Sequence, residues 1–149
     1  MKPRTAVLSL LALCFASLAM SQTAPAKAPK PEPVVMEYYY TVKWGHQDEF
    51  LRLFKKNHLP LLKKYQELGE ITKIEMVKPA DHLPEPSRWD FKVTLTYRDI
   101  QAAFGDTSHH EAIRKQLFPD QPTFEREEQR RFEILLAHWD VPIEPVKLD

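Results

Sequence analysis

The feature that most constrains the fold is the order in which two-residue and helical periodicity follow each other. Residues 35–44 alternate as a strand does, with one face made by Met36, Tyr38, Tyr40, Val42 and Trp44. Residues 47–68 then carry an amphipathic helical pattern that Gly69 ends. Residues 70–78 and 89–97 predict two further strands, and the odd positions of the second are all large and apolar. The first half of the domain therefore predicts β-α-β-β.

The rest of the chain completes this order with less regular signals. Helical patterns cover residues 99–104, 108–117 and 123–135, and a fourth strand covers residues 136–143, ending near Pro142. The order β-α-β-β-α-β predicts a ferredoxin-like α+β fold, with a four-stranded antiparallel sheet and helices on one face. The other sheet face is left open, so it either meets water or pairs with a second copy to close a dimeric α/β barrel.

The first residues carry a targeting signal. Lys2 and Arg4 precede an apolar run, residues 6–16, that is too short to span a bilayer, and small residues follow it. This layout is typical of a secretory signal peptide, residues 1–21, so we expect an exported protein that is periplasmic or secreted. The alternative is a retained membrane anchor.

The segment after the signal separates it from the domain. Residues 22–34 are rich in Pro, Ala and Lys, which predicts a disordered linker, with a proline-rich ligand for a partner as the alternative. Residues 35–149 have the length of one small domain.

Charge and cysteine content exclude several classes of protein. The single cysteine, Cys14, lies in the expected signal, so the mature chain has no disulfide, thiolate nucleophile or thiolate metal ligand. The full chain balances 21 basic against 21 acidic residues, and the signal removes only basic ones. Without a basic excess we expect no nucleic-acid partner and, after cleavage, no membrane association.

His58 is the residue that points most directly to a site. At about 100° per residue it lies within the apolar stripe of the first helix, so its ring faces the sheet. Pro60 has no N–H to bond the Lys56 carbonyl, and the helix should kink or loosen there. A kink over a sheet opens space between the two layers, where a small apolar ligand can lie.

The segments around this histidine resemble a known family. Asp48-Glu49-Phe50 and Asn57-His58-Leu59-Pro60-Leu61 are similar to the first helix of the EthD-like proteins, and residues 97–104 resemble the family's passage from third strand to second helix. That family belongs to the dimeric α+β barrel superfamily, together with the antibiotic-biosynthesis monooxygenases and the muconolactone isomerases. This chain lacks the family's Pro-Gly step after the first helix, and Pro119 and Pro122 break its second helical region. The resemblance implies a homodimer with sheets packed face to face and a pocket between each sheet and its own helices.

Each candidate residue also has a purely structural interpretation. His58 can act as a general base or donate to a bound carbonyl, or it can bond the carbonyl that Pro60 leaves free. Tyr38 and Tyr40 can present hydroxyls to a ligand or simply pack in the core, as Trp44 does at the end of the same layer. The predicted ligand-binding set is Tyr38, Tyr40, Phe54, His58, Trp89 and Phe91.

His109 and His110, with Asp106 and Glu111 nearby, raise the question of a metal site. Adjacent histidines on a regular helix point about 100° apart and cannot both reach one ion. We therefore expect an exposed helix start there, and no metal or cofactor.

Two further groups are assigned to surfaces. His138 and Asp140 alternate with Trp139, which predicts that both polar side chains lie on the open sheet face with Lys92. Residues 125–131 are mostly charged, which is typical of a solvated helix face.

Three functional hypotheses follow. The first is an exported homodimeric protein that binds a small apolar or aromatic molecule beside His58. The second is a cofactor-independent oxygenase or isomerase in which His58 transfers a proton and a tyrosine hydroxyl stabilises charge on oxygen. The third is a structural or interaction domain without a ligand.

Overall fold

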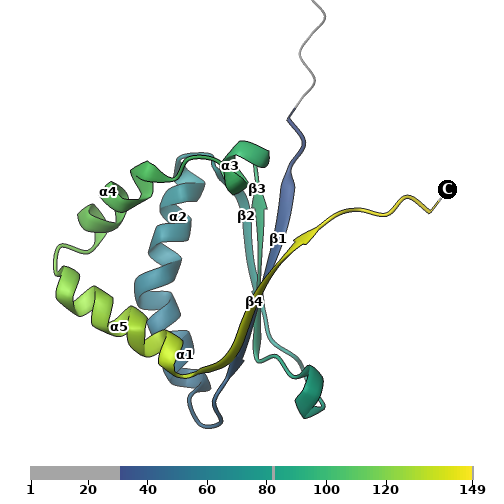
Figure 1. The fold of residues 1–149 in the computed structure, drawn as a ribbon, viewed down its shortest axis with the longest axis vertical. Coiled ribbons are helices and arrows are strands. Elements are labelled where there is room, and N and C mark those ends of the chain that lie inside the picture. The colour runs from purple at the N-terminus through teal and green to yellow at the C-terminus, as the bar shows by residue number, and fades with distance from the viewer. Residues whose placement is uncertain (1–30, 82, 149) are drawn as a thin grey trace, which may run out of the picture.

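The computed structural model describes residues 31–81 and 83–148 (Figure 1). The predicted signal peptide and most of the predicted linker, up to residue 30, lie outside the described residues. None of the helices in these two ranges is long and apolar enough to cross a membrane.

The described residues form one antiparallel sheet of four strands in the order β2-β3-β1-β4. Its strands are β1 (Val34–Val42), β2 (Ile71–Val77), β3 (Phe91–Tyr97) and β4 (Leu135–Ile143). The helices lie on one face of this sheet (Figure 1), which confirms the predicted ferredoxin-like β-α-β-β-α-β arrangement. The two central strands, β3 and β1, carry the apolar alternation that anchors the core, because they are paired on both sides.

The helical layer has two parts. The first is continuous and runs through α1 (Gln47–Leu53), the π-helical turn η1 (Phe54–His58) and α2 (Leu59–Glu67). The second consists of α3 (Ile100–Phe104), α4 (Ser108–Leu117) and α5 (Gln121–Glu133). Helix α4 packs on α2, and α5 packs on α1 and η1. A short 3-10 turn, Glu85–Ser87, lies in the loop between β2 and β3.

The π-helical turn is the predicted loosening of the first helix. The Leu59 N–H donates to the Phe54 carbonyl, five residues back, so the turn holds one residue more than an α-helical turn. Pro60 then falls in the first turn of α2, where a missing N–H is tolerated. The helix therefore continues through the proline without a broken end.

The core lies between the sheet and the first helix. It is built from Phe50 and Phe54 against side chains of the central strands, among them Tyr40, Phe91 and Val93, all at most 7% exposed. The Phe50 and Phe91 rings stack with centroids 5.4 Å apart.

A register shift in β2 explains a pattern that fits no regular strand. In sequence the apolar residues of 70–78 do not share one face, yet Ile71 belongs to the core cluster and Ile74 and Met76 pack against it. The pairing with β3 shifts between Ile71 and Lys73, so Ile71 opposes Tyr97 while Ile74 opposes Leu95. The irregularity brings Ile71 onto the helix side of the sheet.

The open face of the sheet is more apolar than predicted. Trp139 of β4 pairs with Tyr39 and their rings stack with centroids 5.1 Å apart. The Trp89 and Tyr39 rings meet edge to face, with centroids 5.8 Å apart. Trp139 and Ile143 remain 39% and 41% exposed on this face. Lys92 pairs with Glu37 beside them at 2.6 Å.

Candidate functional site

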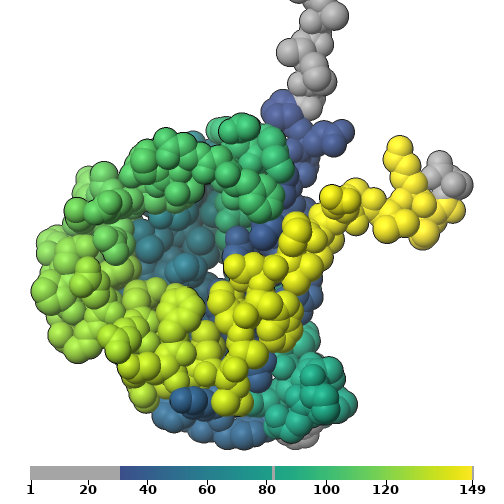
Figure 2. All heavy atoms as spheres, in the orientation of Figure 1, coloured from purple at the N-terminus to yellow at the C-terminus, as the bar shows by residue number. Residues whose placement is uncertain are grey.

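A cavity of about 260 Å³ lies between the sheet and the helical layer. The sheet contributes three tyrosines of β1 and β3 and two aliphatic residues of β3. The first helix contributes His58, Leu62 and Tyr65, and the segment from α3 to α4 covers the remaining side. The lining residues are Tyr38, Tyr40, His58, Leu62, Tyr65, Val93, Leu95, Tyr97, Ala102, Ala103, Thr107 and His110. In Figure 2 the molecule is hollowed between the helices and β4.

His58 closes the cavity at the end of the π-helical turn. Its ring contacts Phe54 at 5.1 Å between centroids, and no hydrogen bond joins its nitrogens to the described residues. The alternative in which His58 bonds the carbonyl freed by Pro60 is therefore not seen. Burial, with smaller effects from Arg131 and His138, lowers the pKa of His58 to about 3, so the imidazole is neutral at physiological pH.

Two tyrosine hydroxyls meet on the floor of the cavity. Tyr38 of β1 and Tyr97 of β3 lie 3.0 Å apart, oxygen to oxygen, and either can be the donor. Burial raises the pKa of both, and their mutual hydrogen bond raises that of Tyr38 further. Both therefore stay protonated, and because the shared bond uses one hydroxyl hydrogen, the second can serve a bound molecule.

His138 belongs to this side of the sheet, and the prediction that places it on the open face is wrong. Its backbone pairs with Tyr40, and the two rings stack at 4.4 Å and 8°. Asp140 pairs with Tyr38 and lies 3.2 Å from the His138 Nε2. That prediction implied that Trp139 faces the helices, whereas Trp139 lies on the open face against Tyr39. The pairing of β4 with β1 decides which face His138 takes, and this pairing cannot be read from the sequence of β4 alone.

Arg131 is a buried charge next to the site. It is 2% exposed and donates to both carboxylate oxygens of Glu128 at 3.0 and 2.7 Å, with its guanidinium 4.6 Å from the Phe132 ring. The prediction of a solvated face for residues 125–131 is therefore wrong at Arg131. Its positive charge opposes protonation of His58.

The six predicted ligand-binding residues fall into three groups. Tyr38, Tyr40 and His58 line the cavity. Phe54 and Phe91 are core residues, and Phe54 supports the His58 ring. Trp89 is not in this cavity, because it precedes β3 and contacts Tyr39 on the opposite face.

Trp44 also departs from its predicted place in the helix-facing layer. It follows β1 in a turn, is 64% exposed and stacks on the guanidinium of Arg88 at 4.1 Å. Gly45, with a φ of 81°, turns the chain directly after it, so the strand ends before Trp44 can reach the core.

The element order and the sheet topology define a ferredoxin-like α+β protein. No protein-family profile and no curated protein matches the chain. Among solved structures it is similar to the protein At3g17210 of Arabidopsis thaliana, with 11% identity and a TM-score of 0.50 over 78% of this chain and 98% of that one.

Two further solved structures are similar to the chain over most of its length. One is SnoaB, a cofactor-independent oxygenase from Streptomyces nogalater, with 11% identity and a TM-score of 0.47 over 77% of this chain and 94% of that one. The other is a dimeric ferredoxin-like protein of unknown function from Thermobifida fusca, with 10% identity and a TM-score of 0.45 over 76% and 92% of the two chains. At such identities the likeness is one of fold alone.

Proposed function

We propose that the chain is an exported binding protein for a small, largely apolar or aromatic molecule that carries one hydrogen-bonding oxygen. The observation that carries this proposal is the cavity beside His58, whose lining is aliphatic and aromatic except for a few polar groups. A cavity of about 150 Å³ is known to hold benzene, so about 260 Å³ suits one substituted ring or a compact bicyclic molecule. The hydroxyl pair of Tyr38 and Tyr97 supplies a donor for the ligand oxygen.

The protonation states favour binding over proton transfer. A general base works best when its pKa lies near the working pH, whereas the pKa of His58 is about 3. The tyrosines are likewise held in their neutral forms. The site therefore offers uncharged hydrogen-bonding groups, which suit an uncharged ligand.

A homodimer through the open sheet face is part of this proposal. Trp139, Ile143 and Val77 leave apolar surface uncovered on that face, at 39%, 41% and 47% exposed. Pairing two such faces would bury this surface and the stacked Tyr39. The cavity lies on the opposite side of the sheet, so it would stay accessible in the dimer.

Export is proposed from the first residues of the sequence. The basic start and short apolar run of residues 1–21 are typical of a signal peptide, and this supports export to the periplasm or to the outside of the cell. Detection of a cleaved N-terminus in the periplasmic or culture fraction of an expressing bacterium tests this.

A cavity-filling substitution tests ligand binding. The probe is 2-naphthol, a neutral bicyclic molecule whose fluorescence can be excited where tryptophan does not absorb. The affinity for 2-naphthol should fall at least about 10-fold in Ala103→Trp, because the new side chain fills the cavity. It should be unchanged in Ala112→Trp, because Ala112 is an exposed residue of α4. The double variant Tyr38→Phe, Tyr97→Phe should weaken binding about 3-fold to 10-fold, the value of one hydrogen bond, because either hydroxyl alone could still donate. Equal binding by Ala103→Trp and Ala112→Trp would reject the site, and a domain without a ligand would then be the better description.

The second candidate function is a cofactor-independent oxygenase or isomerase. Its support is His58 itself, a titratable group facing a cavity that also holds tyrosine hydroxyls. This function requires bound substrate to raise the pKa of His58 by several units. Turnover that falls below a midpoint near pH 6 to 7, and that vanishes in His58→Gln while 2-naphthol still binds, would favour the enzyme.

A further inference from the structure

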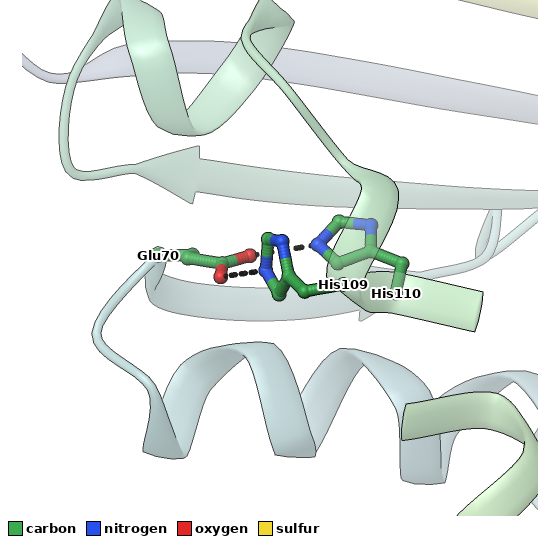
Figure 3. Close-up of side chains that lie close together, drawn as sticks. All are labelled: Glu70, His109 and His110. Atoms are coloured by element: carbon green, nitrogen blue, oxygen red, sulfur yellow. Dashed lines mark hydrogen bonds and ion pairs between the residues drawn. The ribbon is translucent and has the colours of Figure 1, made fainter. Parts of the chain in front are cut away.

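Three potential metal ligands converge at the start of α4. None of them belongs to the predicted ligand-binding set. Glu70 lies just before β2, and His109 and His110 lie in the first turn of α4 (Figure 3). The His109 Nε2 lies 2.6 Å from one carboxylate oxygen of Glu70, and the His110 Nε2 lies 2.9 Å from the other. The ligand atoms of all three residues lie within 4.8 Å of one another.

The local backbone explains how adjacent histidines meet. The His110 N–H donates to the Thr107 carbonyl at 2.9 Å, a bond across three residues that tightens the start of α4. The two imidazole rings lie 4.4 Å apart at 67° and direct their Nε2 atoms to the same carboxylate (Figure 3). Adjacent side chains leave a helix about 100° apart, but the imidazole tips of His109 and His110 still reach the same carboxylate.

The residue types and spacing suit a borderline transition-metal ion. Two imidazoles and a carboxylate are typical ligands of Zn²⁺, with metal–ligand distances of about 2.0 to 2.2 Å. Tetrahedral geometry at these distances separates ligand atoms by about 3.3 Å. The present separations of 2.6 and 2.9 Å would therefore open by about half an ångström, which side-chain rotation can supply.

Neighbouring groups orient the three ligands. The Tyr65 ring stacks on His110 at 3.9 Å and 21°, which fixes the imidazole plane. The Asp106 carboxylate accepts from the N–H and the hydroxyl of Ser108 at the start of α4, so it offsets the positive end of the helix dipole. Arg98, which lines the same hollow, is paired with Asp99 at 2.8 Å. Such support around metal ligands is what positions them in established sites.

The cluster opens on a hollow of its own. This hollow, about 260 Å³, is lined by Glu70, His109 and His110 together with Arg98, Gln101 and Asp106. Three protein ligands beside an open hollow leave a fourth position for water or a small anion, unlike a closed structural site. His110 and Thr107 line both this hollow and the cavity beside His58.

We propose that Glu70, His109 and His110 bind one divalent transition-metal ion, of the Zn²⁺ class, with an open coordination position. The ion joins the start of α4 to the start of β2, two segments that are distant in sequence. Because His110 is shared with the cavity beside His58, the bound ion also holds one side of that cavity in place.

The test uses the untagged protein and Zn²⁺ alone. Calorimetric titration should show one equivalent bound, and Co²⁺ in its place should give the visible absorption of a four- or five-coordinate site. Glu70→Gln, His109→Gln and His110→Gln should each weaken binding by more than about 100-fold, beyond the 10-fold to 100-fold loss typical of residues that only support ligands. The matched control is the double variant His46→Gln, Glu49→Gln, which removes a histidine–carboxylate pair of 2.9 Å elsewhere and should bind as the wild type does.

A second measurement separates a lost ligand from a lost fold. His109 is largely exposed, so His109→Gln should keep the wild-type circular dichroism and lose only the rise in melting temperature that Zn²⁺ gives the wild type. Failure of the wild type to bind Zn²⁺, or full binding by both Glu70→Gln and His109→Gln, would overturn the proposal. The cluster would then be a carboxylate held by two histidines. The 2-naphthol titration of the cavity is made without Zn²⁺, so the two proposals succeed or fail separately.

Discussion

The buried neutral His58 predicts a specific loss of stability in acid. Its pKa is about 3 in the folded protein and about 6.5 in an unfolded chain, so between these values the unfolded state binds one more proton. Stability then rises with pH through this window and falls as the pH drops below about 6.5. Each pH unit inside the window is worth about 1.36 kcal/mol, so a change from pH 7.5 to pH 5.0 should cost about 2 kcal/mol through His58 alone.

The assay is urea unfolding of the wild type and His58→Gln at both pH values and one protein concentration. The protein has six histidines, so the informative quantity is the difference between the two proteins, in which the other five cancel. The wild type should lose about 2 kcal/mol more than His58→Gln. Leu62→Ala, at another residue of the same cavity, should lower stability equally at both pH values. An equal acid loss in the wild type and His58→Gln would refute the burial of a neutral imidazole.

Three further substitutions test the fold. Trp139→Glu should convert a dimer to a monomer in light scattering, whereas Leu117→Glu on α4 should not, because only Trp139 lies on the open face. Phe50→Ala should cost about 3 to 5 kcal/mol in urea unfolding, since this ring is fully buried among Tyr40, Phe54 and Phe91. Asp99→Ala should cost about 1 kcal/mol, because its carboxylate caps α3 by accepting from an N–H at 2.8 Å; a loss below a few tenths would contradict this cap.

The fold could be predicted because its signals are local and agree with one another. The alternation of β1 and β3, the stripe of the first helix and the positive φ of Gly69 at its end all act within a few residues. The face of Ile71 could not be predicted, since it depends on a register shift against β3. The same limit applies to β4, where pairing with β1 decides that His138 faces the helices and Trp139 faces outward.

The candidate site was predictable only for residues whose facing follows from the periodicity of their own strand or helix. Tyr38 and Tyr40 share a strand face and His58 lies on the helix above them, so periodicity alone brings the three together. Tyr97 and His138 join them through strand pairing, and Arg131 through the packing of α5, none of which a single segment records. The cluster of Glu70, His109 and His110 escaped prediction for the same reason, because its carboxylate comes from another element.

The wide turn at Phe54–His58 and the pyrrolidine ring of Pro60 depend on each other. A π-helical turn is equivalent to an α-helix with one residue inserted, so deleting Lys55 would allow the backbone to close into a regular helix. Pro60 would then stand inside that helix, where its ring clashes with the preceding turn at a cost of about 3 kcal/mol. A shortened chain would therefore need a second change at position 60 before it could straighten. Such a pair of changes would remove the offset that holds His58 over the tyrosines while leaving the sheet untouched.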